Sequence, residues 1–323
     1  MGSPQTVVGT PAPPRTGMAG PAPDGAVSPV PDAAWVGVLM MAGSALSNQV
    51  GAAVGALAFP AIGAVGVVAV RQWVAGLALT ALARPRPWTF TAAQWRPVLL
   101  LAVVFATMNV SLYTAIDRIG LGLAVTLEFL GPLAVALAAS RRRADLACAL
   151  VAAAGVVVLT RPQPTTDYAG IASGLLAAAC WAGYILVNRE LGQRVPGGAG
   201  PAVSSALSAV VFVPVGAVVL AAHPPSAGAA ACAVTAGLLA SAVPLFVDLR
   251  ALRRVPTGAY GIFMSINPVL AAVVGLVVLQ EALPWDAWAG IGAIVLANAA
   301  AQLLAARSGR RAAPAAGAAH DGG

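Results

Sequence analysis

The chain has 323 residues, of which 59% are apolar and only 9% are charged, and its formal net charge is +7. A soluble domain carries roughly 25% charged residues, so this composition excludes a protein that exposes its whole surface to water. The chain has no lysine, and most of its arginines lie in short segments between apolar stretches, which indicates membrane topology rather than a basic face for nucleic acid.

The two ends of the chain differ from its middle. Residues 1–32 are rich in Pro, Gly, Ala, Ser and Thr and predict a disordered N-terminal tail. They contain no basic segment followed directly by an apolar run, so a signal peptide is not expected. Residues 307–323 have a similar composition and predict a disordered C-terminal tail.

Ten apolar stretches lie between these tails, and many approach or exceed the roughly 18–20 residues needed to cross a bilayer. Since backbone in lipid must satisfy its own hydrogen bonds, we expect each stretch to be a helix. The predicted fold class is therefore an all-α membrane protein with ten transmembrane helices. The predicted spans are 34–57, 61–83, 97–116, 119–139, 144–160, 170–191, 202–222, 230–250, 258–279 and 285–306.

The arginines predict how these spans are oriented. With both termini in the cytoplasm, the internal loops and the C-terminal flank hold fourteen arginines, and the external loops hold only Arg118 and Arg161. Cytoplasmic loops of membrane proteins are enriched in basic residues. The sequence therefore predicts a multi-pass protein of the cytoplasmic (inner) membrane with both termini inside the cell.

An internal repeat divides the spans into two halves. Gly122 and Pro132 in the fourth span recur as Gly258 and Pro268 in the ninth, at a constant offset of 136 residues. Chance similarity between Ala- and Val-rich helices is the alternative, and the aligned mid-span prolines argue against it. Because each half has an odd number of spans, five, the second half must be inverted, as in many secondary transporters. The predicted repeats cover residues 33–160 and 170–306.

Two charged residues lie deep inside predicted spans, where charges are costly and usually face a cavity or the bundle interior. Glu128 is near the middle of the fourth span, one turn before Pro132, which has no N–H to donate to the carbonyl of residue 128. Its carboxylate can bind a cationic substrate group or a proton, or it can be a structural partner of Arg71 in the second span. Arg71 in turn either binds a substrate carboxylate or pairs permanently with Glu128.

Other candidate substrate-binding residues are polar or aromatic and lie inside predicted spans: Gln49, Asn109, Tyr113, Trp181, Tyr184, Tyr260 and Asn267. Asn109 and Tyr113, four residues apart, share a helix face, and so do Trp181 and Tyr184, three apart. Tyr113 and Tyr260 have an alternative reading as aromatic residues at the membrane interface. Residues expected to allow bending or gating are Gly131, Pro132 and Pro268.

The enzyme classes with well-known motifs are not expected. The two histidines, His223 and His320, fall in a predicted external loop and in the tail, and neither a zinc-protease motif nor a phosphate-binding glycine-rich loop is present. The three cysteines have no metal-binding spacing. We therefore predict no metal and no cofactor, with proton coupling left open.

Several segments carry a family resemblance. The run from Leu127 to Pro132 (Leu-Glu-Phe-Leu-Gly-Pro), with supporting segments 179–186, 252–257, 264–268 and 279–283, is similar to the EamA-type drug/metabolite transporter superfamily. Within that superfamily it resembles the threonine/homoserine exporter branch. The resemblance extends over roughly residues 35–306.

This resemblance implies a ten-helix bundle of two inverted five-helix repeats, with a central cavity and secondary export of amino acids or related metabolites by alternating access. The expected partners are a small-molecule substrate and the lipid bilayer, and no oligomeric state is predicted. Family members commonly carry Glu before the proline of the ninth helix, where this chain has Asn267. Export of drugs, nucleobases or sugars therefore stays open. A non-transporting membrane scaffold or an intramembrane enzyme without familiar motifs is a further alternative.

Overall fold

A computed structural model describes residues 32–138, 143–160, 167–195, 198–244, 247 and 265–312. Throughout these ranges the regular secondary structure is helical and no β-strand is present, so the all-α prediction is confirmed. Four of the described helices are long and apolar enough to cross a membrane: α2 (Phe59–Ala83), α3 (Ala92–Ile119), α7 (Tyr168–Arg194) and α8 (Ala199–Ala222).

The remaining helices overlap predicted spans, except for one short 3₁₀-helix that lies between the second and third predicted spans. They are α1 (Asp32–Ala56), the short 3₁₀-helix η1 (Pro87–Thr89), α4 (Leu121–Glu128), α5 (Leu130–Ala138), α6 (Arg143–Thr160), α9 (Ala227–Gly237), the π-helix η2 (Leu238–Ala242), α12 (Asn267–Val278) and α13 (Trp285–Ala312). The ninth predicted span is described only from residue 265. The last helix continues past its predicted end at residue 306, through a segment whose Ala and Arg residues favour helix.

Within the described residues, two predicted spans contain a break in the helix. The fourth is two helices, because α4 ends at Glu128 and α5 begins at Leu130. Pro132 cannot donate to the carbonyl of Glu128, so the helical hydrogen-bond ladder is weakened at this point. In α2, Gly63 is non-helical, with φ of 67° and ψ of 166°. Only glycine adopts such a conformation without strain.

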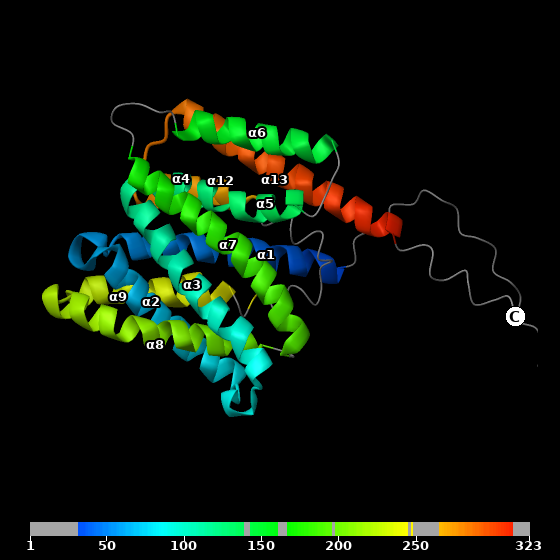
Figure 1. The fold of residues 1–323 in the computed structure, drawn as a ribbon. Coiled ribbons are helices and arrows are strands. Elements are labelled where there is room, and N and C mark those ends of the chain that lie inside the picture. The colour runs from blue at the N-terminus through cyan, green and yellow to red at the C-terminus, as the bar shows by residue number, and fades with distance from the viewer. Residues whose placement is uncertain are drawn as a thin grey trace, which may run out of the picture.

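Helices from the two halves of the chain pack against each other. α2 contacts α8, α3 contacts α7, α4 contacts α12, α6 contacts α13, and α1 contacts both α9 and η2. In Figure 1, α6 and α13 lie together at the top of the molecule, and α4, α5 and α12 lie beneath them. The largest buried cluster combines apolar residues of α1 to α4 with residues of α8, α9 and α12. The core is therefore built at the boundary between the halves.

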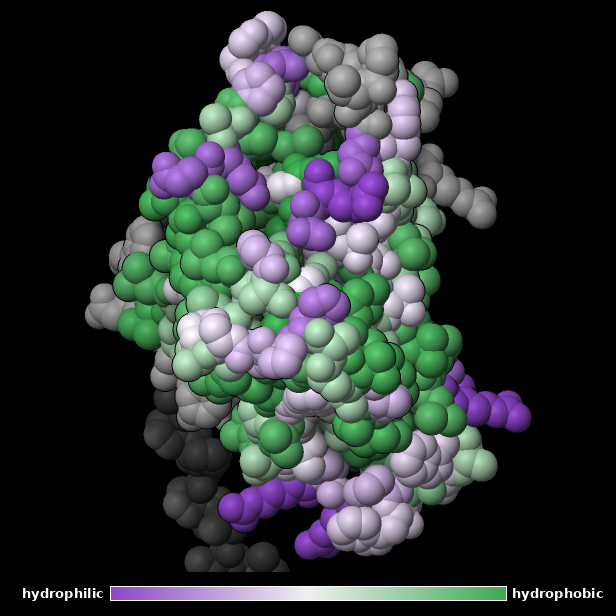
Figure 2. Space-filling model, turned by 90° about the vertical axis from the view of Figure 1, so that its left-hand side faces the viewer, coloured by the Kyte–Doolittle hydropathy of each residue, from purple (hydrophilic) through white to green (hydrophobic). Residues whose placement is uncertain are grey.

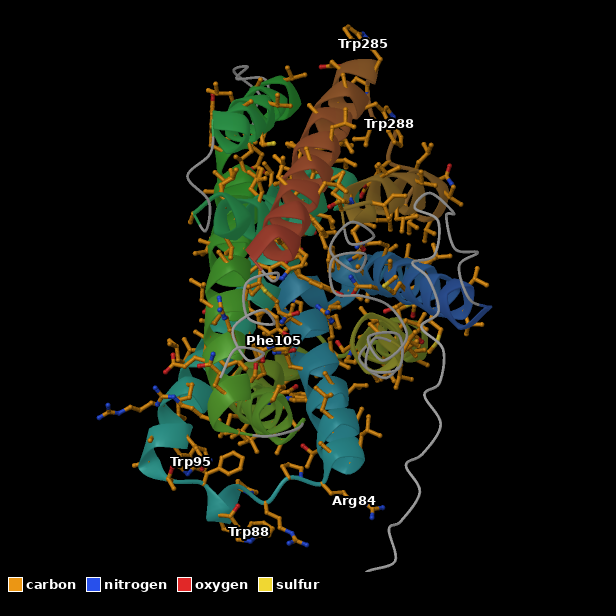
Figure 3. The ribbon with its side chains drawn as sticks, turned by 90° about the vertical axis from the view of Figure 1, so that its right-hand side faces the viewer. Arg84, Trp88, Trp95, Phe105, Trp285 and Trp288 are labelled. Atoms are coloured by element: carbon orange, nitrogen blue, oxygen red, sulfur yellow. The ribbon has the colours of Figure 1, made fainter. Side chains whose placement is uncertain are left out.

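The surface is largely apolar. In Figure 2, hydrophobic residues cover most of the face in view, and hydrophilic residues gather in a few patches. Trp88 and Trp285 are each 79% exposed. Figure 3 shows Trp88 and Trp95 at one end of the molecule and Trp285 and Trp288 at the other. Tryptophan is enriched at both membrane–water interfaces, so these residues mark the two ends of a lipid-facing surface.

Loops predicted to lie on the same side of the membrane contact one another. Arg118 Nε donates to Asp167 Oδ1 at 3.0 Å, and the Glu281 carboxylate accepts from the backbone at the start of α4 at 2.8 Å. Gln94 Nε2 donates to the carbonyl of Arg194 at 2.8 Å. The first contact joins two loops predicted to be external, the second joins such a loop to the predicted external end of the fourth span, and the third joins two loops predicted to be internal.

Candidate functional site

Arg71 of α2 is buried, and residues of two other elements, α3 and η2, hold its guanidinium. Nε donates to Ser241 Oγ at 3.2 Å, and one terminal nitrogen donates to the carbonyl of Ala240 at 3.1 Å. The other terminal nitrogen donates to Asn109 Oδ1. The guanidinium carbon lies 5.0 Å from the ring centroid of Tyr113, at cation–π distance. A positive charge is therefore fixed where α2, α3 and η2 meet.

The guanidinium retains unused donors. It has five N–H groups, and the bonds to Ser241, Ala240 and Asn109 use three of them. One N–H on each terminal nitrogen has no acceptor among the residues the structure describes. Arginine binds carboxylates through two such N–H groups. Arg71 can therefore bind an anionic group without losing its protein partners.

Asn109 and Tyr113 face Arg71 from α3, as their spacing predicts. Asn109 accepts from Arg71 and donates through Nδ2 to the carbonyl of Phe105 at 2.7 Å. The Tyr113 ring is 0% exposed and meets the Phe59 ring edge-on, with centroids 6.0 Å apart. The alternative that Tyr113 belongs to an interfacial aromatic belt is wrong, because the ring is enclosed by protein.

Glu128 is the last residue of α4 and is buried, with 7% of its side chain exposed. Its carboxylate interacts electrostatically with Arg71, Tyr113 and Cys180. The alternative of a permanent ion pair with Arg71 is not observed, since the guanidinium donates to other groups. Among the described residues no hydrogen bond to this carboxylate is present. An acidic and a basic side chain thus lie near each other without a hydrogen bond between them.

The π-helix η2 is the part of the site that sequence reasoning missed. In an α-helix each carbonyl accepts from the N–H four residues later. Here the N–H of Val243 bonds to the carbonyl of Leu238, five residues earlier, and Pro244 has no N–H. The carbonyls of residues 239 and 240 therefore lose their α-helical donors.

Side chains from other helices donate hydrogen bonds to these two carbonyls. Ser47 Oγ of α1 donates to the carbonyl of Leu239 at 2.8 Å, and Arg71 donates to that of Ala240. Single π-helical turns are frequent at functional sites. In the sequence, this irregularity is indicated by Pro244 inside the predicted span 230–250, because proline has no N–H to donate.

Gln49 and Asn267, both predicted to bind substrate, bind each other. Gln49 Nε2 donates to Asn267 Oδ1 at 3.0 Å, and each residue is 2% exposed. Asn267 is the first residue of α12, and Pro268 follows it at the start of the helix. Proline is favoured at this position because its missing N–H has no helical acceptor there. The pair joins α1 to the start of α12.

The two aromatic candidates of α7 lie in different surroundings. Trp181 packs edge-on against Phe129, with ring centroids 4.5 Å apart, and borders the central cluster. Tyr184 packs against Phe105 at 6.1 Å, within a separate apolar group that includes Leu101. The structure therefore brings Trp181, but not Tyr184, to the core that surrounds Tyr113. Tyr260 lies outside the described residues.

Gly131, predicted to allow gating, lies against backbone. A Cβ at this position would collide with the carbonyl of Ala178 and lie 3.2 Å from the backbone nitrogen of Ala182. The glycine thus lets α5 approach α7 closely, as small residues do in membrane bundles. Pro132 lies at the α4–α5 interruption and Pro268 at the start of α12. Whether these three residues act in gating stays a prediction.

Among the described residues, no group of three or more His, Cys, Asp or Glu side chains is arranged to hold a metal ion. Cys148, Cys180 and Cys232 are free thiols.

Comparison with known proteins gives the site a context. Residues 168–300 match the EamA-like transporter family. The threonine/homoserine exporter RhtA of Escherichia coli K12 is 36% identical over 262 residues, which are 78% of this chain and 86% of that protein. The chain belongs to the EamA-like transporter family. RhtA of Salmonella typhimurium LT2 is also 36% identical, over 84% of this chain and 92% of its own length.

A solved crystal structure of a protein resembles this EamA family member with a TM-score of 0.56 at 19% identity, covering 85% of this chain and 98% of that one. At this identity the likeness shows the fold alone. Family membership and the apolar helices identify a multi-pass inner-membrane protein of a transporter family, which implies that it is not an enzyme.

Proposed function

We propose that this protein is a secondary-active exporter of small zwitterionic metabolites, with amino acids such as threonine and homoserine as substrates. The observation that carries the proposal is a buried basic side chain, Arg71, near a buried acidic side chain, Glu128, with no hydrogen bond between them. Two N–H groups of Arg71 have no acceptor among the described residues and can bind a carboxylate, and Glu128 offers an acceptor for an ammonium group or a proton. The names of the RhtA relatives support the same substrate class.

Alternating access between two inverted five-helix repeats is the proposed mechanism. Exchanging the halves replaces α1 by α7, α2 by α8, α3 by α9 with η2, and α6 by α13. Under this exchange the α2–α8 and α6–α13 contacts map onto themselves, and the α3–α7 contact becomes the observed α9–α1 contact. Gln72 Nε2 also donates to Ser208 Oγ, 136 residues later, which is the offset of the sequence repeat. Counterparts facing each other are expected beside an axis that relates two repeats.

We also propose that both termini are cytoplasmic. The excess of arginine in the predicted internal loops supports this orientation. The contacts of Arg118 with Asp167 and of Gln94 with Arg194 support the alternation of the spans, because each joins loops assigned to one side.

Flux measured in liposomes tests the proposed function. Purified protein is reconstituted, and efflux of labelled threonine and homoserine is compared between wild type and Glu128→Gln. The substitution keeps the size of the side chain and removes its charge, so we expect flux to fall at least about tenfold, as for loss of a charge-assisted hydrogen bond.

Glu190→Gln is the matched control. Glu190 forms an exposed ion pair with Arg194 at 2.7 Å, and such pairs contribute little. Its flux is expected to equal that of wild type. Unchanged flux and unchanged pH dependence in Glu128→Gln would remove Glu128 from the mechanism.

A cargo without an ammonium group, such as a drug, nucleobase or sugar, is the second candidate. The observation that favours it is the neutral Gln49–Asn267 pair, at the position where family members commonly carry Glu. An export screen of cells loaded with individual amino acids, nucleobases or sugars separates the two. Export of a sugar or nucleobase without export of threonine would favour this second reading.

A further inference from the structure

Four buried side-chain atoms have no hydrogen-bond partner among the described residues: Gln72 Oε1, Trp73 Nε1, Tyr113 Oη and Ser205 Oγ. Gln72, Trp73 and Ser205 belong to α2 and α8, which pack against each other. Tyr113 is the member of this group that interacts electrostatically with both Arg71 and Glu128. Buried polar groups are nearly always paired, so an unpaired hydroxyl near Arg71 and Glu128 requires an explanation.

The ring of Tyr113 is held in place on several sides. Phe59 meets it edge-on, and the Arg71 guanidinium lies 5.0 Å from its centroid. A Cβ at Gly55 would lie 3.3 Å from its Cε1 atom, so α1 packs directly against the ring edge. The hydroxyl is close to Arg71, yet the geometry does not form a regular hydrogen bond with it. A hydroxyl fixed in this way, with no partner in the described part of the chain, is pre-organised to bind a group from outside it.

We infer that Tyr113 is a specificity-determining residue whose hydroxyl binds the side-chain hydroxyl of a hydroxy amino acid. This inference rests on the proposed function. If the substrate carboxylate binds Arg71 and its ammonium group binds Glu128, the first side-chain atoms of the substrate lie next to Tyr113, which interacts with both of these residues. A phenolic hydroxyl both donates and accepts, so it pairs with an alcohol in either direction.

Selectivity follows from the same geometry. A site built to hydrogen-bond a substrate hydroxyl rejects an analogue that lacks it, because the protein's polar group is then left buried and unpaired. Threonine and homoserine are therefore preferred over valine and norvaline, in which a methyl group replaces the hydroxyl at nearly the same size.

The experiment uses the full-length protein in liposomes and compares wild type with Tyr113→Phe. Efflux of threonine against valine, and of homoserine against norvaline, is measured over a range of concentrations. We expect the preference for the hydroxy amino acid to fall about tenfold, because threonine and homoserine are transported more slowly. A tenfold change corresponds to the free energy of about one hydrogen bond. Tyr168→Phe, which makes the same chemical change in a side chain that is 62% exposed, is the control and keeps the wild-type preference.

Thermal unfolding in detergent gives a second readout. Removal of an unpaired buried hydroxyl is expected to leave the unfolding temperature of Tyr113→Phe unchanged or raise it. A lower unfolding temperature would overturn the inference, because it would show that the hydroxyl already has a partner in the protein. If Tyr113→Phe exports threonine and keeps the wild-type preference for threonine over valine, the proposed role of Tyr113 is wrong, while the proposed function stands. Absence of threonine and homoserine efflux from wild type would overturn the proposed function as well.

Discussion

The packing of α1 on the π-helix η2 can be tested at one glycine. A Cβ on Gly51 would lie 2.6 Å from the backbone nitrogen of Ala240, 2.9 Å from its Cβ and 2.9 Å from the carbonyl carbon of Leu239. These atoms are mostly backbone, so no side-chain rotation relieves the overlap. Gly51→Ala must therefore displace α1 or η2, whose carbonyls bind Ser47 and Arg71.

The magnitude follows from two opposing terms. Overpacking of a tight contact typically costs about 1–3 kcal/mol, whereas replacing a helical glycine by alanine contributes up to about 1 kcal/mol. The net expectation for Gly51→Ala is a loss of up to about 2 kcal/mol in the free energy of unfolding. Gly43 lies on the same helix and is exposed, and a Cβ there meets nothing within 4 Å. Gly43→Ala is therefore expected to be neutral or stabilising.

The assay is thermal unfolding of both variants in the same detergent, followed by threonine flux in liposomes. Gly51→Ala should unfold at a lower temperature than wild type and transport more slowly, while Gly43→Ala should match wild type in flux and unfold at the same or a higher temperature. Equal unfolding temperatures and equal flux for the two variants would refute the proposed tight contact between α1 and η2.

Two further predictions concern groups at other positions. Burial raises the pKa of Glu281, and the hydrogen bond that its carboxylate accepts from the N–H of Leu121 offsets only part of this effect. Folding therefore favours the protonated acid. Its contribution to stability is present below the ordinary glutamate pKa of about 4.3 and is lost as the pH rises through the raised pKa. Glu281→Gln should remove this part of the pH dependence of thermal unfolding, and an unaltered profile would contradict it. Ser241→Ala removes the hydroxyl that accepts from Arg71 Nε and should lower flux about tenfold. Ser241→Thr keeps the hydroxyl and should retain flux. An equal loss of flux in both variants would show that packing at this position matters, and not the hydrogen bond.

Much of the architecture was readable from local sequence. Helix positions follow from the lengths of apolar runs, because each membrane-spanning backbone must satisfy its own hydrogen bonds. Prolines marked interruptions for the same reason: Pro132 lies beside the break after Glu128, and Pro268 follows the start of α12. Residues such as Arg71 and Glu128 stood out because a charge in an apolar span is costly to bury.

The partners of those residues depended on tertiary structure. Spacing placed Trp181 and Tyr184 on one helix face, yet they pack into different clusters. Arg71 donates to Ser241, 170 residues later, and Gln49 donates to Asn267, 218 residues later. Hydrophobic period and helix length are properties of one segment, so sequence alone determined them. Which polar atoms meet is decided by how close distant helices approach and by which carbonyls an irregular turn such as η2 leaves unpaired, and only the assembled bundle determines both.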